Sequence, residues 1–287
     1  MEIIDVKNSQ DIILRGCLFD VKNKEICVLF IPGMAGNIIE NKFIQVLGEE
    51  LQKKNIGFVC GHNQGSFHIV DYACKDNFIR RGVSFEKFDD CLSDISAYVD
   101  YIKNLGYKNI IIAGHSLGAN KVIYYLSKNK SDVIKAYILL GACDMAYETS
   151  LIENKEKLIK EAKENIVNGV PDKILSQLVW NYYILSSKRF IDLIENKNSR
   201  NLPITSKLGS FDALKSIKLP LLAVAGEFDD SCSDNIEKYL SLLIKNTDYK
   251  GEYAIVKGAG HTYCNHEYDL FKVVYKFILS LQNYSLQ

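Results

Sequence analysis

The sequence has no excess of either charge, since 35 basic and 35 acidic side chains leave a formal net charge of zero over 287 residues. A balanced chain has no general attraction to nucleic acid or to anionic lipid, so neither is expected as a partner. Low-complexity tracts are absent, and 47% of the residues are hydrophobic. Disorder is therefore not expected, and the length suits one large domain or one domain with an insertion.

Long apolar runs are also missing. The longest, such as "VIKAYILLGAC" at 133–143, are too short and too interrupted to cross a bilayer, so no membrane span is expected. The first residues, "MEIIDVKNSQDII", have neither a basic start nor an apolar segment, which is not the pattern of a signal peptide. Both features favour a cytoplasmic protein.

No Cys-x-x-Cys pair occurs among the eight cysteines, which lie at positions 17, 27, 60, 74, 91, 143, 232 and 264. An even number is compatible with disulfides in a secreted chain. Several cysteines, however, sit inside patterns typical of buried strands, such as "EICVLFIPG", so free buried thiols in a reducing cytosol fit better. No spacing typical of a metal site appears, and we expect no metal and no cofactor.

Short apolar runs alternate with longer stretches of helical periodicity. The strand-like runs lie at 16–21, 27–33, 56–61, 109–114, 134–142, 219–226 and 252–258. The helical patterns between and after them lie at 41–54, 85–106, 119–129, 235–246 and 267–282. This alternation predicts an α/β fold with a mostly parallel central sheet and helices on both faces. The early strands, joined without a helix, predict an antiparallel edge.

The alternation of strand-like and helical patterns stops between Cys143 and Phe211, where no good strand pattern appears. Three helix-like stretches and a polar loop fill this span, the stretches lying at 147–169, 172–187 and 188–196. The first has its charges at helical spacing, which is typical of a solvated face. The simplest interpretation is a core formed by residues 1–142 and 212–287 and interrupted by a helical insertion at 143–211.

The stretch "NIIIAGHSLGANKVIYYL" places Ser116 between Gly114 and Gly118, where a strand pattern passes into a helix pattern. In a tight G-x-S-x-G turn, the residues two before and two after the serine must be nearly without side chains. Such a turn exposes the Ser116 hydroxyl above the sheet edge, and the N–H of Leu117 opens the next helix as a donor for a developing oxyanion. A chance pentapeptide is the alternative, but both flanks match the motif.

A serine hydroxyl is a poor nucleophile unless a base takes its proton and a third group orients that base. The order serine, acid, histidine leaves two of the five histidines as the base, His261 and His266. His261 lies in "VKGAGHTY", after the last predicted strand, where small residues let an imidazole reach the carboxyl edge of the sheet. His266 has the position of an N-terminal residue of the final helix, so we favour His261.

The orienting acid is expected where the buried strand in "LPLLAVAGEFDDS" breaks at Gly226 into an acidic loop. Asp229 and Asp230 both lie in this loop, and one of them can instead cap the next helix. Asp144, after "YILLGAC", is a further candidate. We favour Asp229 over the other two.

A second oxyanion donor is expected in the loop after the early strand "VLFIPG". This loop reads "PGMAGN" at 32–37, and its glycines let the backbone come close to the site. Met34 is placed to offer its N–H there. Without the other parts of the site, an ordinary glycine turn would be the default interpretation.

The segments "IPGMAGN", "GHSLGA", "GEFD" and "GAGHTY" occur in this order over essentially the whole chain. They resemble the α/β-hydrolase superfamily, specifically its capped serine hydrolases of the esterase, lipase and peptidase-like kind. The resemblance implies Ser116 as nucleophile, Asp229 as orienting acid and His261 as base. It also implies the backbone N–H groups of Met34 and Leu117 as the oxyanion hole.

Two further points follow from this resemblance. The helical stretch at 143–211 sits where members of the superfamily often insert a cap over the pocket. Pro32 stands where many members carry a histidine before the glycine. Because the expected oxyanion donor is a backbone group, this difference should reshape the loop without abolishing activity.

The predicted cap concentrates aromatic side chains in "VWNYY", which includes Trp180, Tyr182 and Tyr183, with Phe190 beyond. Such aromatics more often pack a cap against its core than touch a ligand. Trp180 and Tyr183, taken with Met34, are nevertheless candidates for the substrate pocket and favour an apolar acyl or aromatic substrate. We expect hydrolysis of a small-molecule carboxylic ester or thioester through an acyl-enzyme. Acyl transfer, carbon–carbon bond cleavage and a ligand-binding fold with little activity stay open.

Overall fold

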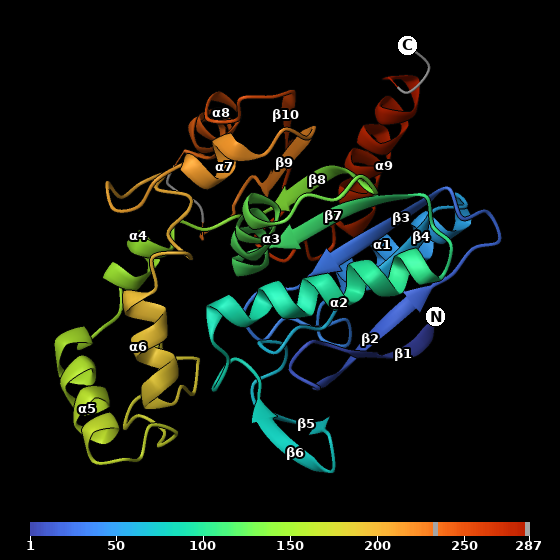
Figure 1. The fold of residues 1–287 in the computed structure, drawn as a ribbon. Coiled ribbons are helices and arrows are strands. Elements are labelled where there is room, and N and C mark those ends of the chain that lie inside the picture. The colour runs from blue at the N-terminus through green and yellow to red at the C-terminus, as the bar shows by residue number, and fades with distance from the viewer. Residues whose placement is uncertain (232–234, 285–287) are drawn as a thin grey trace.

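The computed structural model describes residues 1–231 and 235–284, and its centre is one eight-stranded sheet (Figure 1). The strands lie in the order β1-β2-β4-β3-β7-β8-β9-β10. Their bounds are β1 Glu2–Lys7, β2 Ile13–Phe19, β3 Ile26–Ile31, β4 Gly57–Cys60, β7 Asn109–His115, β8 Ile134–Leu140, β9 Leu221–Gly226 and β10 Gly251–Val256. Neighbouring strands from β4 to β10 pair in parallel, whereas β1 and β2 pair antiparallel. The predicted mostly parallel sheet with an antiparallel N-terminal edge is confirmed.

Alternate side chains of the central strands pack on opposite faces of the sheet. In β3, Leu29 and Ile31 belong to the hydrophobic cluster of one face, while Val28 and Phe30 belong to the cluster of the other. This division follows from the two-residue period of a strand, and it explains why a central parallel strand is apolar throughout. A sheet that is buried on both sides requires helices on both sides.

Helices cover both faces, as the alternating pattern predicts. One face is packed by α2 (Cys91–Asn104), which a short 3₁₀ turn precedes, and by α3 (Leu117–Lys128), α7 (Asp212–Ser216) and α8 (Ile236–Lys245). The other face is packed by α1 (Lys42–Lys53) and α9 (Glu267–Tyr284). No helix in the described part of the chain combines the length and the apolarity that a membrane crossing requires.

The loops that carry the candidate site residues all leave the same edge of the sheet. Residues 32–37 follow β3, and Ser116 follows β7. Asp229 lies after β9, and His261 lies after β10. Because these strands run parallel, their carboxyl ends lie side by side, and segments far apart in the sequence converge at that edge.

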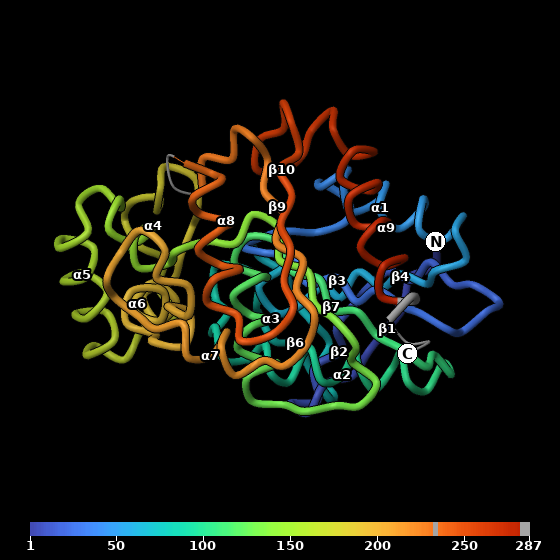
Figure 2. The backbone as a smooth tube through the Cα atoms, turned by 90° about the horizontal axis from the view of Figure 1, so that it is seen from above, coloured from blue at the N-terminus to red at the C-terminus, as the bar shows by residue number. Residues whose placement is uncertain are grey.

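Residues 143–211, all of which the structure describes, contain α4 (Met145–Ser150), α5 (Lys155–Val167) and α6 (Ser187–Glu195) and no strand of the central sheet. Both views show these helices grouped at one side of the molecule, opposite β1 and α9 (Figures 1 and 2). The end of the span returns to the core, where Leu202 is fully buried and Asn201 Nδ2 donates to the Asn120 carbonyl at 2.8 Å. The helical group is therefore anchored on α3.

The helix predicted over 172–187 is wrong. Trp180 and Asn181 have positive φ angles of 53° and 56°, and Val179 pairs with Tyr183 in an isolated bridge. Two consecutive left-handed residues reverse the chain and cannot belong to a right-handed helix. The aromatic residues that suggested helical spacing instead pack around this turn, with the Trp180 and Tyr183 rings 6.0 Å apart.

The single helix predicted over 147–169 is also wrong, because two helices occupy this range. α4 ends at Ser150 and α5 begins at Lys155, and Asn154 between them has a left-handed φ of 52°. The sequence pattern did not predict β1 or the exposed hairpin of β5 (Val70–Cys74) and β6 (Asn77–Arg81), which pair with each other outside the main sheet. These elements bury few side chains, so their apolar patterns are weak.

The cysteines in the described part of the chain are free thiols. They are Cys17, Cys27, Cys60, Cys74, Cys91, Cys143 and Cys264. All of these are buried or half-buried except Cys264. Cys232 lies outside the described residues. The prediction of free and largely buried thiols is confirmed at the described positions.

Candidate active site

Ser116 occupies a strained turn between β7 and α3. Its backbone has a φ of 55° and a ψ of −131°, which is unusual for a residue with a side chain. A Cβ at Gly114 would overlap the Gly118 carbonyl, and a Cβ at Gly118 would overlap the carbonyl of Ile31. Both glycines are therefore required by close backbone approach, as the spacing predicts. Backbone strain of this kind persists only where the surrounding structure holds the residue in place, and it is found most often at functional sites.

Asp229 and His261 form a hydrogen-bonded pair at the same edge of the sheet. The His261 Nδ1 lies 2.9 Å from Asp229 Oδ1, and the Asp229 side chain is fully buried. The loops after β9 and β10, which carry these two residues, are also joined by the Phe228 N–H, which donates to the Ala259 carbonyl at 2.8 Å. Gly141, at a positive φ of 49°, makes room for the pair, because a Cβ there would lie 2.7 Å from Asp229 Oδ2.

The electrostatics of this pair suit a histidine that receives a proton. Burial disfavours the imidazolium, but the Asp229 carboxylate outweighs burial and raises the pKa of His261 above its ordinary value. Burial would likewise raise the pKa of Asp229, yet the hydrogen bond with His261 holds it below its ordinary value. Each partner thus stabilises the charged form of the other.

The side chain of Ser231 also touches the pair, and sequence reasoning missed it. Its hydroxyl donates to Asp229 Oδ1 at 2.8 Å and lies 2.7 Å from His261 Nδ1. Its backbone N–H donates to the same carboxylate oxygen at 3.1 Å. The spacing of two residues after an aspartate is the signal that could have revealed it, because it allows the aspartate to close a local turn.

The Ser116 hydroxyl lies against the thiol of Cys143, with an Oγ–Sγ distance of 3.5 Å. In the described part of the chain, no hydrogen bond joins Ser116 Oγ to His261. Catalytic hydrogen bonds are often long or poorly aligned without substrate and tighten in the complex. Burial raises the pKa of Cys143 to about 12, so this neighbour is a neutral thiol and not a competing nucleophile.

The loop after β3 lies directly against the serine turn. A Cβ at Gly33 would lie 2.8 Å from Ser116 Cβ and 3.3 Å from the Leu117 nitrogen, so only glycine allows this approach. Leu117 is the first residue of α3, where backbone N–H groups have no partner within the helix. In the described structure, the N–H of Met34 likewise makes no hydrogen bond. The N–H groups of Leu117 and Met34 therefore remain available as hydrogen-bond donors, one in the serine turn and one in the loop packed against it.

The candidate pocket residues lie where the insertion meets this edge. Met34, Trp180 and Tyr183 are half-buried and pack on one hydrophobic cluster that also contains Leu117 and Cys143. A cluster that joins the insertion to the site is consistent with both interpretations of these aromatics, packing and substrate contact.

His68 is a further aromatic neighbour of this region that the sequence analysis did not single out. It stacks on Tyr183 with ring centroids 5.8 Å apart. Trp180 is held by its indole N–H, which donates to the Glu148 carbonyl at 3.0 Å.

The alternative site residues have other partners. Asp230 is exposed next to the buried Asp229. Asp144 caps α4 through the N–H groups of Ala146 and Tyr147, and also accepts the N–H groups of 205 and 206. His266 lies just before α9 and contacts Asp269 at 3.5 Å.

The family described as "Protein of unknown function (DUF1749)" matches residues 18–281. The UPF0613 protein PB24D3.06c of Schizosaccharomyces pombe is 24% identical to this chain over 267 residues, covering 82% of this chain and 79% of that protein.

Several solved structures share the fold. The α/β hydrolase GrgF from Penicillium sp. sh18 has a TM-score of 0.74 at 13% identity and covers 98% of both chains. The siderophore hydrolase EstB from Aspergillus fumigatus has a TM-score of 0.71 at 14% identity, with the same coverage. Est1E from Butyrivibrio proteoclasticus has a TM-score of 0.64 at 19% identity and covers 99% of this chain and 100% of its own. These similarities show the α/β-hydrolase fold, as the sequence motifs predict.

Proposed function

Because the chain belongs to the DUF1749 family and has the α/β-hydrolase fold, we propose that it is a serine hydrolase that cleaves a carboxylic ester or thioester through an acyl-enzyme. One observation carries this proposal. A buried Asp229–His261 pair lies at the same sheet edge as Ser116, which is held in a strained turn between two required glycines. An ordinary strand-to-helix turn needs neither the strain nor the charged pair.

In the proposed reaction, the hydroxyl of Ser116 rotates away from Cys143 and attacks the carbonyl carbon of the substrate. His261 Nε2 takes the hydroxyl proton, while Asp229 holds the ring through Nδ1 and stabilises the imidazolium. The backbone N–H groups of Met34 and Leu117 bind the oxyanion. His261 then protonates the leaving alcohol or thiol, and a water molecule that it activates hydrolyses the acyl-enzyme.

The substrate is proposed to carry an apolar or aromatic acyl group, and residues 143–211 are proposed to form the cap that contacts it. Support comes from the aromatic and thioether side chains of Met34, Trp180 and Tyr183 at the junction between the insertion and the site. Est1E, with the same fold, has a structure with ferulic acid bound, which is an aromatic carboxylic acid. Apolar lining of this kind favours such acyl groups over sugars or phosphates.

The test is covalent labelling followed by turnover. A fluorophosphonate probe should label the wild-type protein and fail on Ser116→Ala, and p-nitrophenyl esters of graded acyl length should be hydrolysed only by the wild type. Labelling without hydrolysis of any ester or thioester would favour acyl transfer or carbon–carbon cleavage. Absence of labelling in a folded wild type would contradict the proposal and favour a binding protein.

A further inference from the structure

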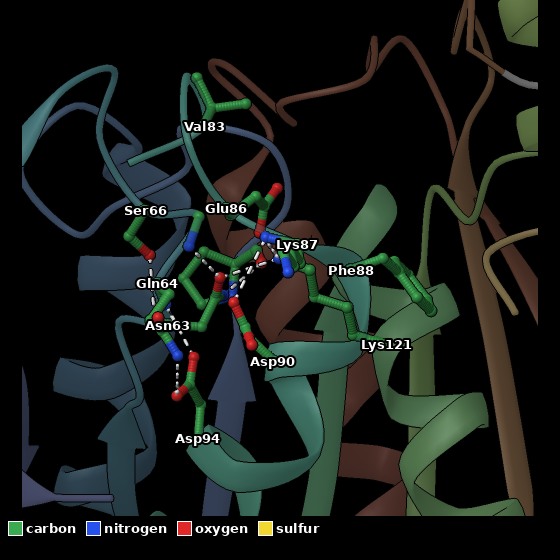
Figure 3. A network of polar contacts seen from close by, with 12 residues as sticks. Asn63, Gln64, Ser66, Val83, Glu86, Lys87, Phe88, Asp90, Asp94 and Lys121 are labelled. Atoms are coloured by element: carbon green, nitrogen blue, oxygen red, sulfur yellow. Dashed lines mark hydrogen bonds and ion pairs between the residues drawn. The ribbon is translucent and has the colours of Figure 1, made fainter. Parts of the chain in front are cut away.

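A group of fully buried charges, which includes the Glu86 and Lys121 labelled in Figure 3, is connected by hydrogen bonds to the loop that carries Met34. Glu86, Lys121 and Arg189 are each only 1% exposed. Glu86 Oε2 accepts from Lys121 Nζ at 2.6 Å, and Glu86 Oε1 accepts from Arg189 Nη2 at 3.1 Å. The three residues come from separate parts of the chain, namely the segment before α2, the helix α3 that begins at the serine turn, and α6 of the insertion.

Asn63 connects these charges to the loop after β3. Its Oδ1 accepts a hydrogen bond from Lys121 Nζ at 2.8 Å, and its Nδ2 donates to the Pro32 carbonyl at 3.0 Å. Pro32 is two residues before Met34. Figure 3 shows Asn63 together with Glu86 and Lys121 in this network. The position of the first half of the loop therefore depends on an asparagine that the buried lysine orients.

Gly65 connects the second half of the same loop. Its N–H donates to Asn63 Oδ1 at 2.9 Å, and its carbonyl accepts from the Ala35 N–H at 3.0 Å. A Cβ at Gly65 would overlap the Glu86 carboxylate, so this glycine lies flush against the buried charge. Met34 thus stands between two residues, Pro32 and Ala35, whose backbone groups are both fixed through Asn63 and its neighbours.

The charges also reach into the insertion. Arg189 donates from Nε to the Val83 carbonyl at 3.3 Å and from Nη1 to Asp192 Oδ2 at 3.1 Å. The same Asp192 oxygen accepts from the Phe88 N–H at 2.9 Å. Residues of α6 therefore bind Glu86 itself and the backbone before and after it, at Val83 and Phe88. A shift of α6 would move Glu86.

Stability alone does not account for such a network. Buried ion pairs are often no better for stability than apolar residues of the same size, because removing charges from water is costly. What charged groups supply is directional geometry, and an oxyanion donor must be held to within about 0.5 Å of its productive place. The network ends at the backbone of Pro32 and Ala35, on either side of Met34, whose N–H is the proposed second oxyanion donor.

We propose that Lys121, Glu86 and Asn63 are positioning residues that fix the position of the Met34 N–H, and that Arg189 couples this position to the insertion. This inference rests on the proposed function, since it concerns how one oxyanion donor of that reaction is positioned. It assigns no chemical step to the three side chains. Their effect is expected in the rate of the chemical step and not in substrate binding.

Asn63→Asp is the sharpest test. The new carboxylate keeps the acceptor for Lys121 and Gly65 but replaces the donor to Pro32 with an oxygen that repels its carbonyl. On a p-nitrophenyl ester we expect kcat to fall about 10- to 100-fold with KM within about threefold, because loss of an oxyanion donor or misplacement by about 1 Å has effects of this order. A trifluoromethyl ketone, whose adduct places an oxyanion in the hole, should lose affinity in proportion to kcat.

Asn109→Asp is the matched control. Asn109 is half-buried and donates from Nδ2 to the Glu25 carbonyl at 3.0 Å, so the same substitution again replaces an amide donor to a backbone carbonyl with a carboxylate. It lies at the start of β7, at the opposite end of the strand from Ser116, and we expect lower thermal stability with kcat near that of the wild type. Lys121→Met is the second variant, since it removes the orienting cation and leaves Glu86 paired with Arg189. It should lower kcat and ketone affinity as Asn63→Asp does.

The outcomes separate the two proposals. If the wild type neither reacts with a fluorophosphonate nor hydrolyses an ester, the proposed function fails. If the wild type is active and folded Asn63→Asp or Lys121→Met retains full kcat and ketone affinity, the positioning proposal is overturned. Equal losses of kcat in Asn63→Asp and Asn109→Asp would also overturn it, because the effect would then come from stability alone.

Discussion

The imidazole of His115 packs against that of His261, with ring centroids 4.5 Å apart, and its Nε2 lies 2.9 Å from the His261 carbonyl oxygen. The residue next to the proposed nucleophile thus donates a hydrogen bond to the backbone of the proposed base. Burial lowers the pKa of His115 to about 3, so it remains neutral beside an imidazole that must accept a proton. A neutral neighbour avoids the repulsion that a second cation would impose.

His115→Phe should retain the ring packing and lose this hydrogen bond. We expect kcat to fall by less than about tenfold, because a single neutral hydrogen bond contributes on the order of 1 kcal/mol. KM should change little, since His115 is buried behind the base. Steady-state kinetics and a thermal melt on the same preparation measure both effects. A loss comparable to that of Ser116→Ala in a folded variant would show that His115 has a direct chemical role.

Asp229→Asn and Asp230→Asn should differ strongly in turnover. Neutralising an acid that orients the base costs on the order of 10⁴-fold in kcat in serine proteases, because the histidine loses its tautomer and its counter-charge. Asp229 is buried against His261, whereas Asp230 is exposed. Turnover of one ester substrate, with circular dichroism to check folding, is the measurement. Near-normal activity of Asp229→Asn would refute the assignment of the acid.

The pH dependence of kcat/KM should show an acid limb from His261. The base must be neutral, and its pKa is raised above the usual value of about 6.5, so activity should fall as the pH drops through a midpoint above that value. Glu148 contributes to this raised pKa through its negative charge. Burial raises the pKa of Glu148 itself to about 7.

Glu148→Gln removes that charge, so the acid limb should move to lower pH while the maximal rate stays similar. Asp230→Asn should shift the limb in the same direction, since the Asp230 carboxylate also raises the pKa of His261. Profiles of the wild type and both variants between about pH 5 and pH 9 give the shift. A limb that moves to higher pH would mean that these carboxylates do not face the base.

Gly33→Ala should abolish most of the activity, because the added methyl group would meet Ser116 Cβ at 2.8 Å and push the loop of Met34 away from the serine. Gly106→Ala is the control. Gly106 has a positive φ of 89° but open space around its Cα, so alanine there should cost about 1 kcal/mol of stability and leave turnover intact. Fluorophosphonate labelling rates compare the two. Equal labelling of Gly33→Ala and the wild type would contradict the close approach.

Tyr183→Ala should change selectivity among esters, whereas Tyr182→Ala should not. Tyr183 packs on the hydrophobic cluster of the site, and Tyr182 is 61% exposed. The ratio of kcat/KM for a benzoate ester and an acetate ester reports the change. An unchanged ratio in folded Tyr183→Ala would mean that this aromatic residue only packs the insertion against the core.

Some of this protein's features follow from local sequence. Gly114, Ser116 and Gly118 lie within five residues of one another, so one strand-to-helix turn fixes their geometry and the sequence pattern is enough to predict it. The parallel sheet follows equally from the alternation of apolar runs and helical patterns. The order of the motifs along the chain then predicted that Asp229 and His261 lie at the same sheet edge as Ser116.

Other features appear only once the chain is folded. The pairing of Asp229 with His261, 32 residues apart, depends on β9 and β10 being parallel neighbours, and the choice of Asp229 over Asp230 depends on which carboxylate is buried. The turn at Trp180 and Asn181 was missed because tertiary packing of aromatics overrides their helical spacing. Local propensity is a weak guide where long-range contacts decide the backbone.

The buried charges are the clearest case of this division. Glu86 and Lys121 are 35 residues apart, and Glu86 and Arg189 are 103 apart, with nothing in the sequence around any of them to indicate a partner. Each alone has the pattern of an ordinary surface charge. Sequence by itself determined the alternation of strands and helices, the serine turn and the edge where the site lies, because those depend on short-range periodicity. Only tertiary structure decided which charges are buried together, because burial and pairing depend on segments that meet through the fold.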